Sequence, residues 1–212
     1  MKITKFVHSC LLVETPEIRV LIDPGRYSYE SRLLNLARLK NLDYIVITHE
    51  HGDHYDVNFL RQISKHFPHA AIVTNNDLAT KIANLHLQNK IQSGSDENLT
   101  VFEAEHEPLP LELPIPLNIG VHLKDKFTHP GDALDIKRSR EILALPVSAP
   151  GWVNLRIALD AAIKLKPKKI IPVHDWHWHQ KARREQYARV KEWLKPHKIE
   201  FIELENAEPV EL

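Results

Sequence analysis

The chain has 212 residues, and 28 Lys plus Arg residues balance 28 Asp plus Glu residues, so the formal net charge is zero with neutral histidines. This balance excludes a broad basic field for a nucleic-acid backbone, so no nucleic-acid partner is expected. The single cysteine excludes an intramolecular disulfide, and with 14 histidines any metal site must use imidazole and carboxylate ligands, which points to a site with an open position.

Short apolar strands alternate with amphipathic helices in the first half of the chain. Apolar or β-branched runs that end at turn residues predict strands over residues 1–7, 18–22, 44–48 and 70–74. The spacing of apolar residues predicts helices over residues 30–42, 57–67 and about 76–87. Asn76 and Asp77 are suited to cap the last of these helices.

The second half continues the alternation after a proline-rich stretch. Strands are predicted over residues 99–104, 117–123, 141–147, 169–173 and 200–204, and helices over residues 154–165 and 183–194. Pro108, Pro110, Pro114 and Pro116 interrupt any regular ladder, so this stretch is predicted to be a surface loop. Without repeats or a low-complexity linker, the pattern favours a single layered domain over residues 1–212, of the α/β class or α+β by some schemes.

The densest group of coordinating side chains follows the strand at residues 44–48. His49, His51, Asp53 and His54 lie within six residues. In extended or loop backbone, residues two apart point the same way, so both His49 and His51 can reach one ion. Gly52 permits a sharp turn, after which Asp53 and His54 can address a second ion. The alternative interpretation is a hydrophilic surface loop, but such density at a strand end favours a metal site.

Further ligand candidates lie at other strand ends. His106 follows the strand at 99–104, Asp132 lies in a turn between strands, and His174 ends the strand at 169–173. Functional groups often gather at such positions. Each residue alone is more often a capping or core polar residue, whereas together they complete two coordination spheres. Four other histidines remain alternative ligands: His122, His129, His177 and His179.

His49-Glu50-His51-Gly52-Asp53-His54 matches a His-x-His-x-Asp-His signature, and Gly131-Asp132 and His174 follow in the expected order. Residues 8–10 and 20–24 also resemble the amino-terminal strands of proteins that carry this signature. On these residues the chain resembles the metallo-β-lactamase superfamily, in particular its small cytoplasmic metal-dependent hydrolases related to ascorbate-6-phosphate lactonase. The resemblance implies a four-layer αββα sandwich of two mixed β-sheets flanked by helices.

The resemblance also implies a site for two divalent ions. In it His49, His51 and His106 bind the first ion, Asp53, His54 and His174 bind the second, and Asp132 bridges them. Ala133 departs from the family, in which a small hydroxyl residue often follows the bridging aspartate. These ligands suit zinc, and also manganese or iron. Asp53 is the predicted catalytic residue, because its carboxylate could orient the attacking water as well as bind metal.

The leading functional prediction is a cytoplasmic hydrolase that acts on a small-molecule ester, lactone or amide. The alternatives are a metal-dependent phosphodiesterase and a metal-binding scaffold or sensor without activity. No membrane span or secretory signal is predicted, and the oligomeric state stays open. His8 and Asp23 are candidate partners of the ligands or ordinary turn residues, and Cys10 is predicted to be a core residue. The predicted pocket walls are the proline-rich stretch and residues 150–152.

Overall fold

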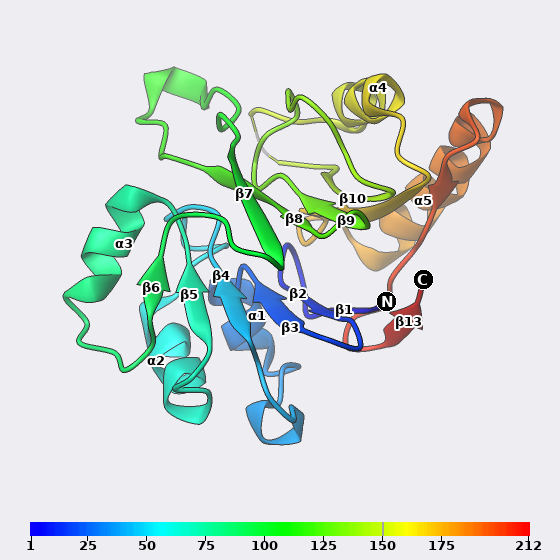
Figure 1. The fold of residues 1–212 in the computed structure, drawn as a ribbon. Coiled ribbons are helices and arrows are strands. Elements are labelled where there is room, and N and C mark those ends of the chain that lie inside the picture. Colours follow the sequence, from blue (N-terminus) through cyan, green and yellow to red (C-terminus); the bar gives the residue numbers. More distant parts are fainter. Residues whose placement is uncertain (150) are drawn as a thin grey trace. The chain divides into compact units, whose positions relative to one another are not determined.

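The computed structural model describes residues 1–149 and 151–212. Within these residues the chain forms two compact units. Residues 1–95 and 204–212 make up the first unit, and residues 96–203 make up the second unit. Each unit contains one mixed β-sheet with helices beside it (Figure 1).

The first unit is built on a seven-stranded sheet in the order β13-β1-β2-β3-β4-β5-β6. Strands β13, β1, β2 and β3 pair antiparallel, and β3 to β6 pair parallel. The carboxyl ends of parallel strands meet at one edge of a sheet, so the residues after β3, β4 and β5 gather there. The strands are β1 (Lys2–Lys5), β2 (Leu11–Glu14), β3 (Arg19–Ile22), β4 (Tyr44–Val46), β5 (Ala71–Val73), β6 (Ile91–Gln92) and β13 (Pro209–Glu211).

Helices α2 (Val57–His66) and α3 (Asn76–Ala83) supply the apolar side chains that pack with this sheet. The Asp56 side chain caps α2 by accepting a hydrogen bond from the Phe59 amide at 2.8 Å. Asn75 caps α3 in the same way, one residue before the predicted cap at Asn76 and Asp77. Phe59, Leu60 and Ile63 of α2 and Leu78 and Ile82 of α3 join Leu21, Ile45 and Ile72 of the strands in one core.

The prediction of a helix over residues 30–42 is wrong. A short helix, α1 (Arg26–Ser31), ends at Arg32, which adopts the left-handed conformation with φ 55°. A single 3-10 turn, η1 (Leu36–Arg38), follows. The leucines in this stretch do not share one buried helical face, because Leu34 and Leu36 are buried whereas Leu33 is exposed. Their regular spacing therefore arose without a helix.

The second unit is built on a six-stranded sheet in the order β12-β11-β10-β9-β8-β7. Strands β12 to β9 pair parallel, and β9, β8 and β7 pair antiparallel. Strand β10 is buried along its whole length, as expected for a parallel strand covered on both faces. The strands are β7 (Leu99–Glu103), β8 (Ile119–Leu123), β9 (Phe127–His129), β10 (Ile142–Pro146), β11 (Lys169–Val173) and β12 (Glu200–Phe201).

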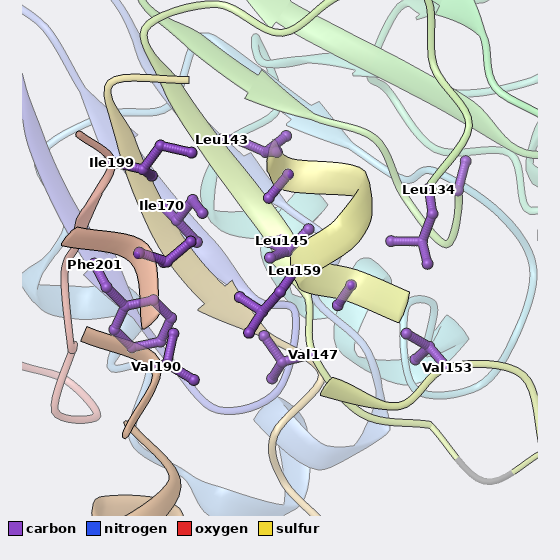
Figure 2. Close-up of a cluster of buried hydrophobic side chains, with 14 of the residues drawn as sticks. Leu134, Leu143, Leu145, Val147, Val153, Leu159, Ile170, Val190, Ile199 and Phe201 are labelled. Atoms are coloured by element: carbon purple, nitrogen blue, oxygen red, sulfur yellow. The ribbon is translucent and has the colours of Figure 1, made fainter. Parts of the chain in front are cut away.

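Helices α4 (Leu155–Leu165) and α5 (Gln180–Leu194) bury their apolar faces against the second sheet. Figure 2 shows Leu159 of α4 near Leu145 of β10, and Val190 of α5 beside Phe201 of β12. Asn154 caps α4 by accepting from the Ile157 amide at 3.2 Å. Two 3-10 turns, η2 (Pro110–Glu112) and η3 (Lys195–His197), complete the elements of this unit.

Two mixed sheets with flanking helices confirm the predicted fold class. The other predicted helices and strands occur, with ends shifted by a few residues. Four strands escaped prediction, namely β2, with four residues, and β6, β9 and β13, with two or three residues each. The single hydrolase domain over residues 1–212 stays a prediction. No helix among the described residues has the length and apolar character to cross a bilayer.

Candidate metal-binding site

The ligand loop, residues 48–55, leaves the end of β4 in the first unit. The Ile47 amide still donates to the carbonyl of Val73 at 2.9 Å, so the loop begins from a fixed strand end. The His54 and Tyr55 amides both donate to the carbonyl of His51 at 2.9 Å, which closes a compact turn. His49 and His54 are buried, whereas His51 and Asp53 are half-buried. The loop therefore holds its four candidate ligands on an ordered backbone.

The turn after β3 packs directly against this loop. The Arg26 amide donates to the carbonyl of Gly52 at 2.7 Å. A Cβ atom placed on Gly25 would lie 1.9 Å from the backbone oxygen of Asp53. Only glycine fits such an approach, so Gly25 lets the start of α1 brace the ligand loop.

Asp23 anchors two of the histidines from the end of β3. Its carboxylate is fully buried and accepts from the Thr48 amide (2.8 Å), the Thr48 hydroxyl (2.9 Å) and Nδ1 of His54 (2.7 Å). Because the Thr48 hydroxyl donates to Asp23, its oxygen accepts from Nδ1 of His49 at 3.0 Å. Both rings thus carry their proton on Nδ1, which directs the Nε2 lone pair away from Asp23 and Thr48.

His8 lies against the carboxylate of Asp53. Nε2 of His8 is 3.0 Å from Oδ2 of Asp53, and Nε2 of His54 is 3.9 Å from the same oxygen. His8, Asp53 and His54 each place one possible ligand atom within 4.8 Å of the others. His8 is buried and has a left-handed backbone with φ 56°, an uncommon conformation in which histidine is enriched. It is thus a partner of Asp53, as the sequence allowed.

The second unit brings together the other three predicted ligands. His106 follows β7, and its Nδ1 donates to the carbonyl of Glu107 at 2.6 Å. His174 follows β11 with φ 67°, and its Nδ1 donates to the carbonyl of Ser148 at 3.2 Å. Nε2 of His106 lies 3.6 Å from one oxygen of Asp132, and Nε2 of His174 lies 3.2 Å from the other. All three side chains are buried.

This arrangement fits a bound cation. A backbone carbonyl can only accept, so His106 and His174 must donate through Nδ1, and the Nε2 atom of each neutral ring is an acceptor. Two acceptor nitrogens then face the acceptor oxygens of Asp132. A proton or a metal ion between them would remove the repulsion, and a second nitrogen that donates to a carbonyl is usual for metal-binding histidines. Imidazole and carboxylate donors suit zinc and other transition metals.

Asn118, which the sequence analysis missed, fixes the segment that carries Asp132. Its Nδ2 donates to the carbonyls of Ala104 (2.9 Å) and Pro130 (3.0 Å), and its Oδ1 accepts from the Asp132 amide at 3.3 Å. Gly131 has φ 62°, and a Cβ there would lie 2.0 Å from Oδ1 of Asn118. The asparagine follows a run of prolines and leucines, and no local pattern distinguishes it from a loop residue.

Trp152 packs beside both histidines of the second unit. Its ring centroid lies 5.6 Å from that of His106 and 5.6 Å from that of His174. Residues 150–152 are predicted from sequence to form a pocket wall. Pro150 lies outside the described residues, and the pocket wall stays a prediction.

A second buried group follows His174 directly. The Tyr187 hydroxyl of α5 donates to the Asp175 carboxylate at 2.6 Å, and Nη1 of Arg183 lies 3.6 Å from the same oxygen. Burial and the neighbouring Asp175 charge raise the pKa of Tyr187 well above its usual value. The side chain of Arg183 is buried and links α5 to the turn after β11 through Asp175.

The four alternative histidines have other surroundings. The ring of His122 stacks on Phe102 with centroids 4.3 Å apart, and its Nδ1 contacts the Thr128 hydroxyl at 2.9 Å. Nδ1 of His129 accepts from the Gly131 amide. His177 and His179 are exposed, and His179 caps α5. These contacts make none of them a better candidate than His106 or His174.

Comparison with known proteins places the chain among metallohydrolases. Residues 2–174 match the family described as the beta-lactamase superfamily domain. A protein of Mycobacterium tuberculosis is 29% identical over 202 residues, which cover 91% of this chain and 92% of that protein. A UPF0173 metal-dependent hydrolase of Exiguobacterium is 28% identical over 197 residues, covering 82% of this chain and 85% of the relative.

A solved structure shows the same fold. The crystal structure of a Parabacteroides distasonis protein named as a metal-dependent hydrolase has a TM-score of 0.73 and 21% identity. The match covers 96% of this chain and 92% of that protein. The predicted superfamily and fold are therefore confirmed, whereas the specific likeness to ascorbate-6-phosphate lactonase stays a prediction.

Proposed function

Because the chain belongs to the beta-lactamase superfamily domain family, we propose that it is a metal-dependent hydrolase with a two-ion site, and that it cleaves a small-molecule ester, lactone or amide. The observation that carries the proposal is the orientation of the imidazoles. His54, His106 and His174 each donate Nδ1–H to a fixed oxygen, so that Nε2 is the atom offered to an ion.

The proposed ligands divide between the two units. His49, His51, Asp53 and His54 come from the first unit, and His106, Asp132 and His174 come from the second. We propose that the units act as one hydrolase domain. In it His49, His51 and His106 would hold one ion, Asp53, His54 and His174 would hold the other, and Asp132 would be shared between the two. The ions are proposed to be zinc, with manganese or iron as the alternatives.

The chain's own groups would orient the reaction. Divalent ions bound by such residues lower the pKa of water and polarise the oxygen of a scissile carbonyl or phosphoryl group. Asp53 would accept a hydrogen bond from the attacking water and so fix its direction, because an ionised carboxylate is acceptor-only. His8, 3.0 Å from Oδ2 of Asp53, would hold that carboxylate in place.

Metal analysis of purified protein tests the proposed site. Elemental analysis should find about two divalent ions per chain. His51→Ala and Asp132→Ala should each lower the metal content and abolish turnover while the circular dichroism spectrum stays that of the folded chain. Glu50→Gln is the matched control, because Glu50 lies in the same loop but pairs with Lys81 at the surface. Full metal content and activity in both ligand variants would refute the assignment.

Substrate class is tested with the metal-loaded protein. A panel of p-nitrophenyl esters, lactones and bis-p-nitrophenyl phosphate separates acyl transfer from phosphoryl transfer. Turnover of the phosphodiester alone would replace the proposal with a phosphodiesterase. A fully loaded protein that is inactive on every member of the panel would favour the non-catalytic scaffold.

A further inference from the structure

The proline-rich segment, residues 108–117, carries a group of exposed apolar side chains in the second unit. Eight large apolar side chains are exposed among the described residues, and four of them lie in this segment. Leu111 is 92% exposed, Leu113 52%, Ile115 48% and Leu117 55%. Scattered exposed leucines are ordinary, but a contiguous group of them usually marks a binding surface. Figure 1 shows the segment in green, between β7 and β8.

The segment is held in a shape that its sequence does not favour. Leu111 and Glu112 have left-handed backbones with φ 59° and 54°. Such a conformation is uncommon for a bulky residue, and backbone strain gathers at functional sites. The four prolines fix φ at their own positions, so the segment loses less conformational entropy on binding a ligand than a segment without prolines would.

The base of the segment adjoins the candidate ligands of the second unit. His106 lies two residues before Pro108 in the chain. Pro110 packs on Gly151, where an added Cβ would lie 2.7 Å from Cγ of the proline. Gly151 precedes Trp152, whose ring is 5.6 Å from the rings of both His106 and His174. The segment that carries the exposed apolar side chains therefore contacts the turn that holds Trp152.

The charges around the segment select against an anionic ligand. Residues 96–123 contain no lysine or arginine. Four of the carboxylates in this stretch, on Glu103, Glu105, Glu107 and Glu112, lie in the segment or just before it, whereas Asp96 and Glu97 precede β7. A phosphodiester, a carboxylate or an anionic lipid surface would be repelled by this field, whereas an uncharged molecule would not.

We infer that the proline-rich segment binds the hydrocarbon part of an uncharged acyl substrate, so that the hydrolase acts on neutral esters or lactones with a long aliphatic chain. This inference rests on the proposed function for the reaction itself. Leu111 and Leu113 contact the chain of the substrate, and its carbonyl lies toward His106 and His174. Each buried methylene of the substrate then contributes about fourfold to the affinity.

A binding experiment that needs no catalysis tests the segment. The ligands are 2-alkylcyclopentanones with methyl, butyl and hexyl chains, which are neutral ketone analogues of lactones that cannot be hydrolysed. Calorimetry should show a Kd that falls about fourfold per methylene for the wild-type protein. In the double variant Leu111→Ser/Leu113→Ser, each added methylene should lower Kd by only about twofold or less. Leu33→Ser, at an exposed leucine of the first unit, should keep the wild-type dependence.

Turnover of p-nitrophenyl acetate, butyrate and octanoate provides the second readout. The double variant should lose most kcat/KM on the octanoate and least on the acetate. Identical chain-length dependence in variant and wild type would overturn the inference, as would absence of ketone binding. A wild-type dimer that the double variant converts to a monomer, with unchanged ketone binding, would also overturn it and assign the surface to a second copy. Chain-length-dependent ketone binding without turnover of any ester would support the apolar site and refute the proposed function.

Discussion

Asp23→Asn tests how the buried carboxylate supports the ligand loop. Asparagine tolerates the left-handed backbone of Asp23 (φ 48°), and its oxygen can still accept from the Thr48 amide. Its NH2 group, however, replaces the oxygen that accepts from Nδ1 of His54 at 2.7 Å. The same oxygen accepts from the Thr48 hydroxyl at 2.9 Å. That hydroxyl can rotate and accept from the new NH2 group, so the net loss is the hydrogen bond from His54 to a charged acceptor inside a fully buried group.

Losing a hydrogen bond to a charged group lowers the free energy of unfolding by about 1.5–3 kcal/mol. For a chain of this size, 1 kcal/mol changes Tm by about 2–4 °C, so the fall should be about 3–12 °C. Loss of the partner of a metal-binding histidine weakens metal affinity by about 10–100-fold. Calorimetric melting of the metal-free protein and a competitive chelator titration measure the two effects separately.

Asp43→Asn is the matched control for this experiment. Asp43 lies in the same unit, is half-buried and accepts from the Arg19 amide at 2.7 Å, but it contacts no candidate ligand in the hydrogen bonds of the described chain. Its variant should lower Tm with metal affinity unchanged. A normal metal affinity in Asp23→Asn would exclude His54 as a ligand held by Asp23, and an unchanged Tm as well would refute the hydrogen-bond network itself.

Three further predictions concern glycine packing, histidine ionisation and the thiol. Gly25→Ala should lower Tm and metal content far more than Gly94→Ala, because a Cβ meets Asp53 at the first position and nothing within 4 Å at the second; equal effects would contradict the packing. Burial and nearby arginines lower the pKa of His122 to about 4. The unfolded chain then binds the extra proton between about pH 6.5 and 4. The unfolding free energy should fall as pH decreases through that window, and His122→Gln should weaken this dependence in urea titrations. Burial raises the pKa of the Cys10 thiol to about 12, so iodoacetamide at pH 8 should modify it only after unfolding, as mass spectrometry would show.

The ligand loop could be predicted from sequence because its signal is local. His49, His51, Asp53 and His54 lie within six residues after an apolar strand, and both the strand and the turn follow from neighbouring residues. His106 and His174 could be selected as candidate ligands because each follows a strand that the sequence pattern predicts. The composition then indicated which groups can bind a metal ion, because a chain with one cysteine must rely on imidazole and carboxylate ligands.

The hydrogen-bond partners of these candidate ligands could not be predicted because they come from distant segments. Asp23 lies 31 residues before His54, and Asn118 lies 14 residues before Asp132. A hydrogen bond at such separation leaves no periodicity in the chain. The helix expected over residues 30–42 failed for a related reason. Leu33 and Leu36 have helical spacing, but tertiary packing buries only Leu36.

Three residues of the candidate site bend the main chain in the same unusual direction, namely His8, Asp23 and His174, with φ of 56°, 48° and 67°. A saturation-mutagenesis screen at these positions would therefore mix two kinds of damage. Valine or threonine would remove the imidazole or carboxylate and also strain the turn. Asparagine and glycine tolerate a positive φ, so these two substitutions alone would report on the loss of the imidazole or carboxylate. A screen scored without that distinction would overstate how many substitutions abolish catalysis directly.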